Sequence, residues 1–322
     1  MIKIYIAPMA GVTDYTYRKI MNEFHPDLMF TEMVSVNAVK MANEKTIKQM
    51  LRLLPNDGVQ IFGRDIDVMV ECAKYVESLG VTYIDVNMGC PMPKITKNGY
   101  GSALLEDPEH IKKLMTAIKK ALKPETKLSM KIRIGYKEHK NPVEIAKIAE
   151  ELNLHHITVH GRTREQMYSG TANWETIKQI KEAVSIPVIG NGDIFSAEDA
   201  YEKATESGVD GIMLARGIYG NPWLIQQIKE KFETGEVTTK VTYIDKIDMA
   251  LKHIEYMKED YPEKKFNFEV RKHLCWYLKG VTGGSKIKNL LNKIDNYDEI
   301  SEILIRLKEK LIEYNSQEKE IK

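Results

Sequence analysis

Eight short apolar runs, each followed by a stretch with helical periodicity, constrain the fold of this chain more than any other feature. The runs cover residues 2–9, 29–34, 59–63, 81–86, 128–134, 157–160, 187–190 and 211–215. Strands that alternate with helices pair in parallel, and eight such units in about 230 residues predict a closed (β/α)8 barrel, the TIM barrel. A doubly wound open sheet is the alternative, but that class usually has fewer strands.

The pattern changes near the end of this barrel region. Residues 233–240 read as a polar linker, and helical periodicity alone continues over 243–260, 266–278, 285–294 and 297–314. We therefore expect two domains, a barrel at 1–234 and a small all-helical domain, a four-helix bundle, at 241–322.

Composition excludes several classes of protein. Of the 322 residues, 43% are hydrophobic and 29% charged, which is typical of a globular protein with a full core. No apolar run approaches the roughly 20 residues that span a membrane, and the N-terminus lacks the features of a signal peptide. The cysteines, Cys72, Cys90 and Cys275, are odd in number and far apart, which favours a reducing compartment over a disulfide framework. No Cys/His spacing resembles a zinc site, so we expect a cytoplasmic protein without a metal.

Most residues suited to binding or catalysis fall at or just after the carboxyl ends of the predicted strands. They are Pro8, Met9, Gln60, Asn87, Cys90, Lys131, His160, Asn191, Asp193 and Arg216. In a barrel, this end carries the active site. Taken alone, Cys90 reads as a buried structural cysteine beside a turn. A glutamine, a lysine and a histidine at equivalent strand ends favour a functional site instead.

Two glycine-rich loops predict a phosphate site. Residues 190–193, Gly-Asn-Gly-Asp, follow the seventh run, and residues 215–217, Ala-Arg-Gly, follow the eighth. Asn221 and Pro222 then suggest the cap and first turn of a helix, whose N-terminus favours an anion. These loops form the common phosphate site of such barrels, and Arg216 adds a charged donor. The alternative is that the glycines only make tight turns.

Positive charge is concentrated in the helical tail. Between Lys264 and Lys293 the chain carries eight Lys or Arg residues and one acid, Glu269, although its total formal charge is +1. His273, Trp276 and Tyr277 are interleaved with these charges. Basic and aromatic side chains together favour a surface that contacts RNA or phosphate, with a merely solvated face as the alternative.

In its strand ends, its glycine-rich loops and its basic tail, the chain resembles the tRNA-dihydrouridine synthases, most closely their bacterial B-like branch. The matching segments are 7–14, 31–34, 59–63, 85–91, 130–133, 159–164, 190–193, 215–217 and 271–273. Of these, the 87–91 motif, Asn-Met-Gly-Cys-Pro, with its following glycine loop is highly specific. The resemblance covers essentially the whole chain, including the helical tail.

The resemblance implies FMN-dependent reduction of uridine in tRNA to 5,6-dihydrouridine, with NADPH as electron donor. The flavin phosphate would lie on Asn191, Gly192, Asp193, Ala215 and Arg216, and the flavin ring against Pro8, Met9 and Ala10. Gln60 and Lys131 would bond the polar edge of the ring, and His160 would contact it. Hydride would pass from flavin N5 to uracil C6, and Cys90 would protonate C5 as general acid. A thiol with an ordinary pKa near 8.5 is already protonated at neutral pH.

The resemblance also implies contacts with the RNA. Asn87 would bond the uracil edge, and the target base would be extruded from the folded tRNA. The basic residues expected to hold the tRNA backbone are Arg164, Arg271 and Lys272 and, from their position in the loops alone, Lys94, Lys97 and Arg162. We expect the enzyme to act as a monomer.

Three other readings fit part of the sequence. A different FMN barrel, such as a dihydroorotate dehydrogenase, would act on a free pyrimidine and would not need the basic helices. A barrel that only binds RNA would not need the polar residues at the strand ends. An aldolase-like barrel would use Lys131 to form a Schiff base.

Overall fold

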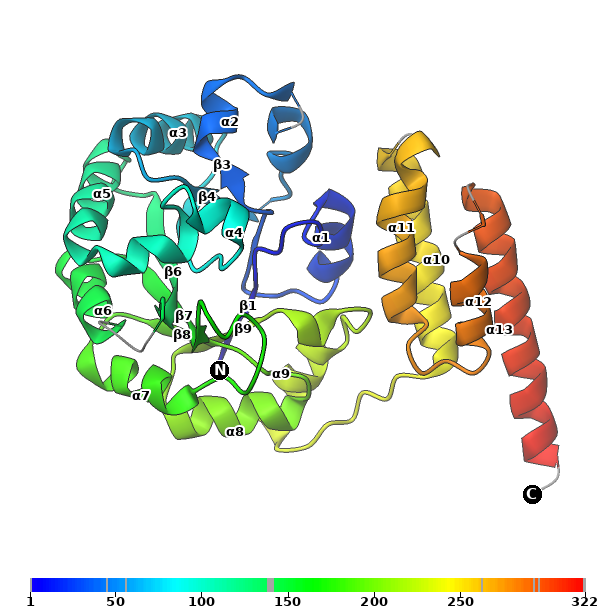
Figure 1. Ribbon diagram of the computed structural model, residues 1–322. Helices are drawn as coiled ribbons and strands as arrows, with labels where there is room; N and C mark the ends of the chain where they lie inside the picture. The colour runs from blue at the N-terminus through cyan, green and yellow to red at the C-terminus, as the bar shows by residue number, and fades with distance from the viewer. Residues whose placement is uncertain are drawn as a thin grey trace.

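A closed barrel of parallel strands forms the first two thirds of the molecule (Figure 1). The computed structural model describes residues 2–44, 46–55, 57–137, 142–261, 263–291, 293–294 and 296–320, with the side chains of 263–269 and 315–320 excepted. The strands are β1 (Lys3–Ile6), β2 (Leu28–Phe30), β3 (Val34–Ser35), β4 (Asp57–Phe62), β5 (Tyr83–Met88), β6 (Lys127–Gly135), β7 (His156–Thr163), β8 (Val188–Asn191) and β9 (Gly211–Leu214). Parallel pairing of β1 with both β2 and β9 closes the barrel.

The predicted barrel is confirmed, with one difference at its second strand. The sequence predicts a continuous strand over 29–34, whereas the structure breaks this segment into β2 and β3. Both pieces pair with β4, so together they occupy one of the eight strand places. Thr31 lies in the break and turns its hydroxyl to the carbonyl of Glu32, a local bond that competes with strand pairing.

Helices surround the barrel. They are α1 (Tyr15–Asn22), α2 (Val36–Lys40), α3 (Ile66–Ser78), α4 (Pro93–Thr96), α5 (Pro108–Ala121), α6 (Pro142–Glu151), α7 (Trp174–Ala183), α8 (Ala197–Ser207) and α9 (Leu224–Thr234). Short turns of other helix types are η1 (Thr46–Met50), η2 (Gly101–Glu106) and η3 (Arg216–Ile218). Asp14, Asp65, Asp107 and Ser196 cap their helices through their own side chains. The helix expected to begin at Asn221 and Pro222 begins instead at Leu224, without a side-chain cap.

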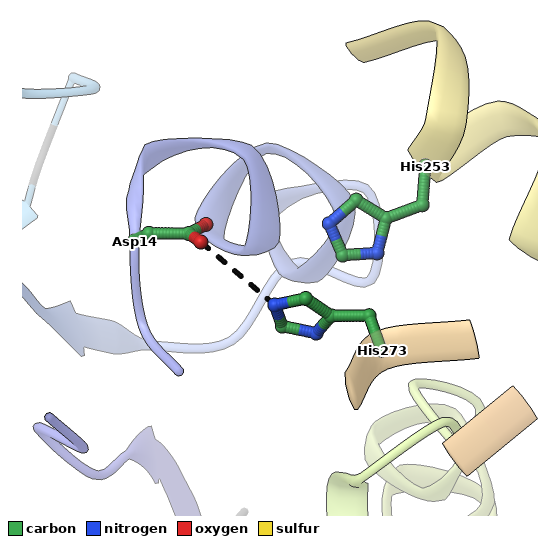
Figure 2. Close-up of side chains that lie close together, drawn as sticks. All are labelled: Asp14, His253 and His273. Carbon is green, nitrogen blue, oxygen red and sulfur yellow. Dashed lines mark ion pairs between the residues drawn. The ribbon is translucent and has the colours of Figure 1, made fainter. Parts of the chain in front are cut away.

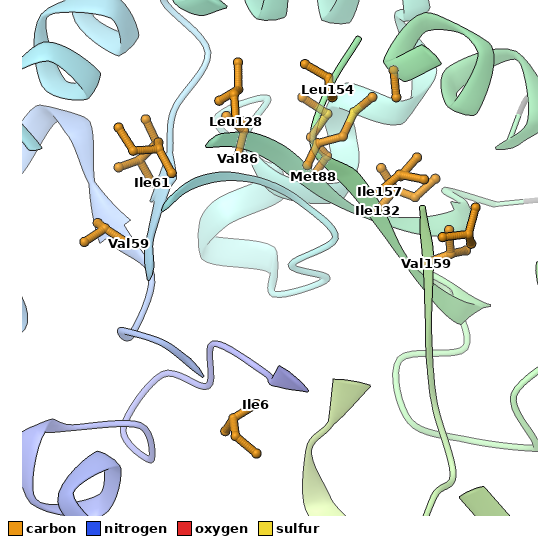
Figure 3. Close-up of a cluster of buried hydrophobic side chains, with 14 of the residues drawn as sticks. Ile6, Val59, Ile61, Val86, Met88, Leu128, Ile132, Leu154, Ile157 and Val159 are labelled. Carbon is orange, nitrogen blue, oxygen red and sulfur yellow. The ribbon is translucent and has the colours of Figure 1, made fainter. Parts of the chain in front are cut away.

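Side-chain alternation along the strands sorts apolar from polar residues. Val59 and Ile61 of β4 and Val86 and Met88 of β5 belong to the large apolar layer between strands and helices, part of which Figure 3 shows. Residues between them point into the barrel, because successive strand side chains face opposite sides. A smaller apolar cluster, which includes Tyr5, Phe30 and Met213, fills part of the interior.

Four helices follow the barrel, as predicted: α10 (Tyr243–Asp260), α11 (Glu263–Tyr277), α12 (Gly284–Leu290) and α13 (Tyr297–Glu320). We call them the C-terminal helices. They have a separate apolar cluster and lie beside the barrel, next to α1 (Figure 1). The Trp276 ring stacks on Tyr219, with centroids 4.1 Å apart, and Asn296 caps α13 through the Glu299 N–H. Domain limits at 234 and 241 are compatible with the two clusters and stay a prediction.

No helix in the described part of the chain is both long and apolar enough to cross a membrane.

Replacement of Arg18 by methionine is expected to destabilise the barrel by roughly 3–5 kcal/mol, because it leaves a buried carboxylate without its partner. Arg18 Nε donates to Asp57 Oδ2 at 3.0 Å, and both side chains are at most 1% exposed. Urea unfolding measures the loss. Lys3→Met is the control: its pair with Asp27 is exposed, so a cost below about 1 kcal/mol is expected. Equal losses in the two variants would contradict the argument.

Candidate active site

The interior of the barrel is polar along β4 to β7. The inward-facing residues there are Gln60, Asp85, Asn87, Ser129, Lys131, Arg133, Thr158, His160 and Arg162. Arg133 donates to the Gly89 carbonyl at 2.8 Å and so fixes the backbone just before Cys90. This polar lining faces the carboxyl end, where the sequence places its candidate site.

Cys90 lies just past β5 and is 9% exposed. Its N–H donates to Asn87 Oδ1 at 3.0 Å, and its carbonyl accepts from the Ser102 N–H and hydroxyl at 3.1 and 2.9 Å. Gly101 fits here only without a side chain, because a Cβ would lie 2.8 Å from the Cys90 carbonyl oxygen. Burial raises the pKa of the Cys90 thiol, which keeps it protonated at neutral pH.

Two basic side chains of the interior, Lys131 and His160, have pKa values shifted by their surroundings. Burial, with the charge of Arg133, lowers the pKa of Lys131 to about 8, although Asp85 opposes the shift. The Lys131 ammonium donates to Asn191 Oδ1 at 3.1 Å. Burial and the neighbouring cations, Lys131 first, lower the pKa of His160 well below its usual value. The His160 imidazole is therefore neutral near pH 7 and can contact an uncharged ring.

An anion cradle lies where β8 and β9 end. Among the described residues, no acceptor outside η3 bonds the backbone N–H groups of Arg216 and Gly217, which begin that short helix. Asp193 does not itself offer positive charge: its carboxylate pairs with Arg162 at 2.7 Å and with Arg216 at 3.0 Å. The ion pair between Asp193 and Arg216 holds the Arg216 guanidinium on the same loop as these N–H groups.

The loops after β8 and β9 touch at Gly217, and Gly192 lies against the loop after β7. A Cβ on Gly217 would lie 2.1 Å from the Ile194 carbonyl oxygen, and one on Gly192 would lie 2.6 Å from Ala172 Cβ. Gly192 also has φ +132, a conformation that side-chain-bearing residues rarely adopt. Unsatisfied N–H groups, close backbone approach and a nearby guanidinium suit a phosphate, so the predicted residues fit a phosphate-bearing cofactor.

The remaining candidates differ in accessibility. Pro8 and Met9 are partly exposed and Ala10 exposed, in a turn closed by the Val12 N–H and Met9 carbonyl at 2.9 Å. Lys94 and Lys97 are exposed at α4, close in sequence to Cys90.

Burial and internal contacts constrain several predicted RNA contacts. The structure speaks against Arg162, because it is 2% exposed and bonded to Asp193 and to the carbonyls of Ser169 and Gly170. Arg164 is partly exposed and lies over the Tyr136 ring. Arg271 and Lys272 are also partly exposed and donate to the carbonyls of Ile294 and Gly11 respectively. They join α11 to neighbouring backbone as well as offering charge.

Asp85, Ser129 and Arg133 are site residues that the sequence reasoning did not single out. The sequence did carry a signal for them. Polar residues recur at alternate positions in β5 and β6, whereas a buried parallel strand is usually apolar throughout. Asp85 is 2% exposed, and burial raises its pKa to about 6 despite bonds from Ser129 and Gln60 and the charge of Lys131.

A second polar cluster joins the C-terminal helices to the barrel. Figure 2 shows Asp14 of the α1 cap facing His253 of α10 and His273 of α11, with 3.8 Å between His273 Nε2 and Asp14 Oδ2. The three could each offer a metal ligand within 4.8 Å of the others. Both ring nitrogens of His253, however, already contact hydroxyls: Nδ1 that of Tyr277 at 3.2 Å and Nε2 that of Thr16 at 3.4 Å. We interpret the cluster as a structural polar contact; the absence of a metal stays a prediction.

A parallel barrel with an anion cradle, a lysine, a neutral imidazole and a protonated thiol at one end has the layout of a barrel enzyme that binds a phosphate-bearing cofactor.

Comparison of solved structures agrees on the fold. Histamine dehydrogenase from Rhizobium sp. 4-9 matches 79% of this chain with a TM-score of 0.56 at 16% identity, and this chain spans 49% of that one. A variant of NCR from Zymomonas mobilis matches 74%, covering 89% of that chain, with a TM-score of 0.52 at 16% identity. Such distant likenesses show the barrel alone.

Sequence relatives are more specific. The profile of the family described as dihydrouridine synthase (Dus) matches residues 5–314. A probable tRNA-dihydrouridine synthase of Rickettsia bellii is 37% identical over 97% of this chain and 94% of its own length. The tRNA-dihydrouridine synthase B of Pasteurella multocida is 37% identical over 91% and 88%. The chain therefore belongs to the dihydrouridine synthase family, a family of flavin-dependent oxidoreductases, and the predicted resemblance is confirmed.

Proposed function

We propose that this protein reduces uridine in tRNA to 5,6-dihydrouridine, with FMN as bound cofactor and NADPH as electron donor. The observation that carries the proposal is the buried, protonated Cys90 at the carboxyl end of β5, on the same barrel end as the anion cradle. The family match over residues 5–314 supports the substrate class.

Residues of the barrel end would share the work of holding the flavin. The phosphate would be held by Asn191, Gly192, Asp193, Ala215 and Arg216, through backbone N–H groups and the guanidinium. The ring would be lined by Pro8, Met9 and Ala10 and contacted by Lys131 and His160. The structure speaks against the predicted contact with Gln60, which is 0% exposed and has both ends of its amide bonded, to Asp85 and to Asn87. When bound, the flavin supplies the hydride that reduces uracil C6.

The chain's own groups then complete the reaction. Cys90 donates its proton to C5 of the uracil, which takes up negative charge as C6 is reduced. The ammonium of Lys131 supplies positive charge within the buried site, and burial excludes water from both steps. Because the Cys90 pKa is raised, the thiol still carries its proton when the base arrives.

The decisive experiment supplies purified protein with unmodified tRNA and NADPH and analyses the nucleosides. Dihydrouridine in the tRNA, dependent on flavin, is expected. Reduction of a free pyrimidine with none on tRNA would replace this proposal by the free-pyrimidine reading. A colourless protein that takes up no FMN yet binds tRNA would favour a barrel that only binds RNA.

Removal of the charges of Lys94 and Lys97 by alanine is expected to weaken tRNA binding. Both ammonium groups are exposed beside the Cys90 loop, and each lost phosphate contact should lower the slope of log K against log salt by about 0.7 to 0.9. Titration of labelled tRNA at several salt concentrations measures this slope.

Lys113→Ala with Lys120→Ala is the matched control for charge, since both lysines are exposed on the outer helix α5. Equal weakening by the two pairs would remove Lys94 and Lys97 from the proposed RNA contact.

A further inference from the structure

Four buried side chains form a continuous hydrogen-bond relay inside the barrel. The Ser129 hydroxyl donates to Asp85 Oδ1 at 2.6 Å, and Gln60 Nε2 donates to Asp85 Oδ2 at 2.6 Å. Asn87 Nδ2 donates in turn to Gln60 Oε1 at 2.8 Å. Finally, the backbone N–H of Cys90 donates to Asn87 Oδ1 at 3.0 Å. The relay therefore connects a buried carboxylate on β5 to the backbone of the candidate acid.

The direction of this relay follows from the carboxylate. An ionised carboxylate accepts hydrogen bonds and cannot donate, so Gln60 must turn its NH2 group toward Asp85 and its oxygen toward Asn87. Asn87 must then turn its NH2 group toward Gln60, which leaves its oxygen for the N–H groups of Cys90 and Gly89. If both amides turned over, the Asn87 NH2 group would face two backbone donors. That arrangement would leave buried groups unsatisfied, which is destabilising.

Little of the relay is open to exchange with water or ligand. Gln60 is 0% exposed, Asp85 2% and Asn87 5%. The Asn87 NH2 group also contacts Met33 Sδ at 3.2 Å, so each polar atom of this amide already has a partner. This geometry speaks against the prediction that Asn87 bonds the uracil edge and assigns it to the protein interior instead.

We propose that Asp85 is a positioning residue, whose carboxylate orients the amides of Gln60 and Asn87 and thereby fixes the backbone of Cys90. Its catalytic meaning rests on the proposed function; the relay itself does not. Asp85 touches neither Cys90 nor any expected substrate atom, so its effect is transmitted through the two amides.

The test compares Asp85→Asn with the double variant that adds Gln60→Glu. Asp85→Asn keeps the shape but can donate, so the amides lose their enforced direction. We expect about ten-fold slower dihydrouridine formation or worse, with flavin content and tRNA affinity unchanged. In the double variant, the amide introduced at position 85 donates to the carboxylate introduced at position 60, which again accepts from Asn87. The rate should recover several-fold over the single variant. If Asp85 only supported the fold, adding Gln60→Glu as a second core substitution would not restore activity.

A second readout does not depend on activity: it is the reactivity of the Cys90 thiol. The rate at which iodoacetamide alkylates Cys90, measured on its own peptide, should rise several-fold in Asp85→Asn and fall back in the double variant. Ser207→Ala is the matched control, because it removes a buried hydroxyl that donates to the Lys203 carbonyl on α8, outside the relay. Alkylation and turnover should stay near wild type in this variant. Unchanged Cys90 alkylation in Asp85→Asn, or no recovery in the double variant, overturns the relay. A wild type that makes no dihydrouridine overturns the proposed function alone, since the alkylation comparison still decides the relay.

Discussion

Replacement of Cys90 by alanine is expected to slow dihydrouridine formation by about 100-fold or more, the usual contribution of a positioned general acid. The substitution removes the only proton donor proposed for uracil C5. Bound flavin and NADPH oxidation should be retained, because the anion cradle lies on β8 and β9 and Cys90 follows β5. Single-turnover reaction of the reduced protein with tRNA separates the two half-reactions.

Cys72→Ala is the matched control for this prediction. Cys72 is also buried, at 3% exposure, but it packs on α3, and burial alone raises its pKa to about 12. Loss of a small packed side chain there should lower stability without changing the chemistry. If Cys90→Ala makes product at the wild-type rate, or if the two variants slow equally, Cys90 is not the acid.

Replacement of Gly217 by alanine is expected to remove most of the bound flavin from the purified protein. Its Cβ would lie 2.1 Å from the Ile194 carbonyl oxygen, so the loops after β8 and β9 must separate. Overpacking of this kind costs typically about 1–3 kcal/mol, and here the movement would fall on the N–H groups that form the cradle. Flavin absorbance per protein and titration of the flavin-free protein with FMN measure the loss.

Gly208→Ala controls for strain without contact with the cradle. Gly208 caps α8 at φ +68, with nothing within 4 Å of an added Cβ. Alanine there should cost roughly 1–2 kcal/mol of stability through its backbone conformation while the flavin stays bound. Full flavin content in Gly217→Ala, or equal flavin loss in the control, would mean that contact between the two loops does not shape the cofactor site.

Local pattern was sufficient to predict the barrel and the four helices that follow it. The apolar runs have the length of buried strands, and Asp14, Asp65, Asp107 and Ser196 carry their capping function in their own side chains. Asn221 has the same chemistry but caps no helix, since a turn bonding the Leu224 N–H to the Asn221 carbonyl precedes α9. A residue type that favours helix caps therefore predicts a helix start only if the backbone after it turns directly into the helix.

Burial of polar groups was less predictable. Arg162 reads in sequence as a basic loop residue, yet it lies inside the barrel because strand β7 extends to Thr163 and turns the side chain inward. Its partner, Asp193, is 31 residues away. The partners of Asp85 are likewise on neighbouring strands, and no spacing within one segment reveals them.

The sequence by itself determined the barrel, the strand ends that carry the candidate chemistry and the family, because periodicity and short motifs are properties of consecutive residues. Only the tertiary structure decided which of these side chains are open and which are committed to one another. It raises the pKa of Cys90 by burial, lowers that of Lys131 toward neutrality and commits Asn87 to the backbone of Cys90. Burial and hydrogen-bond partners depend on segments that meet only when the barrel closes.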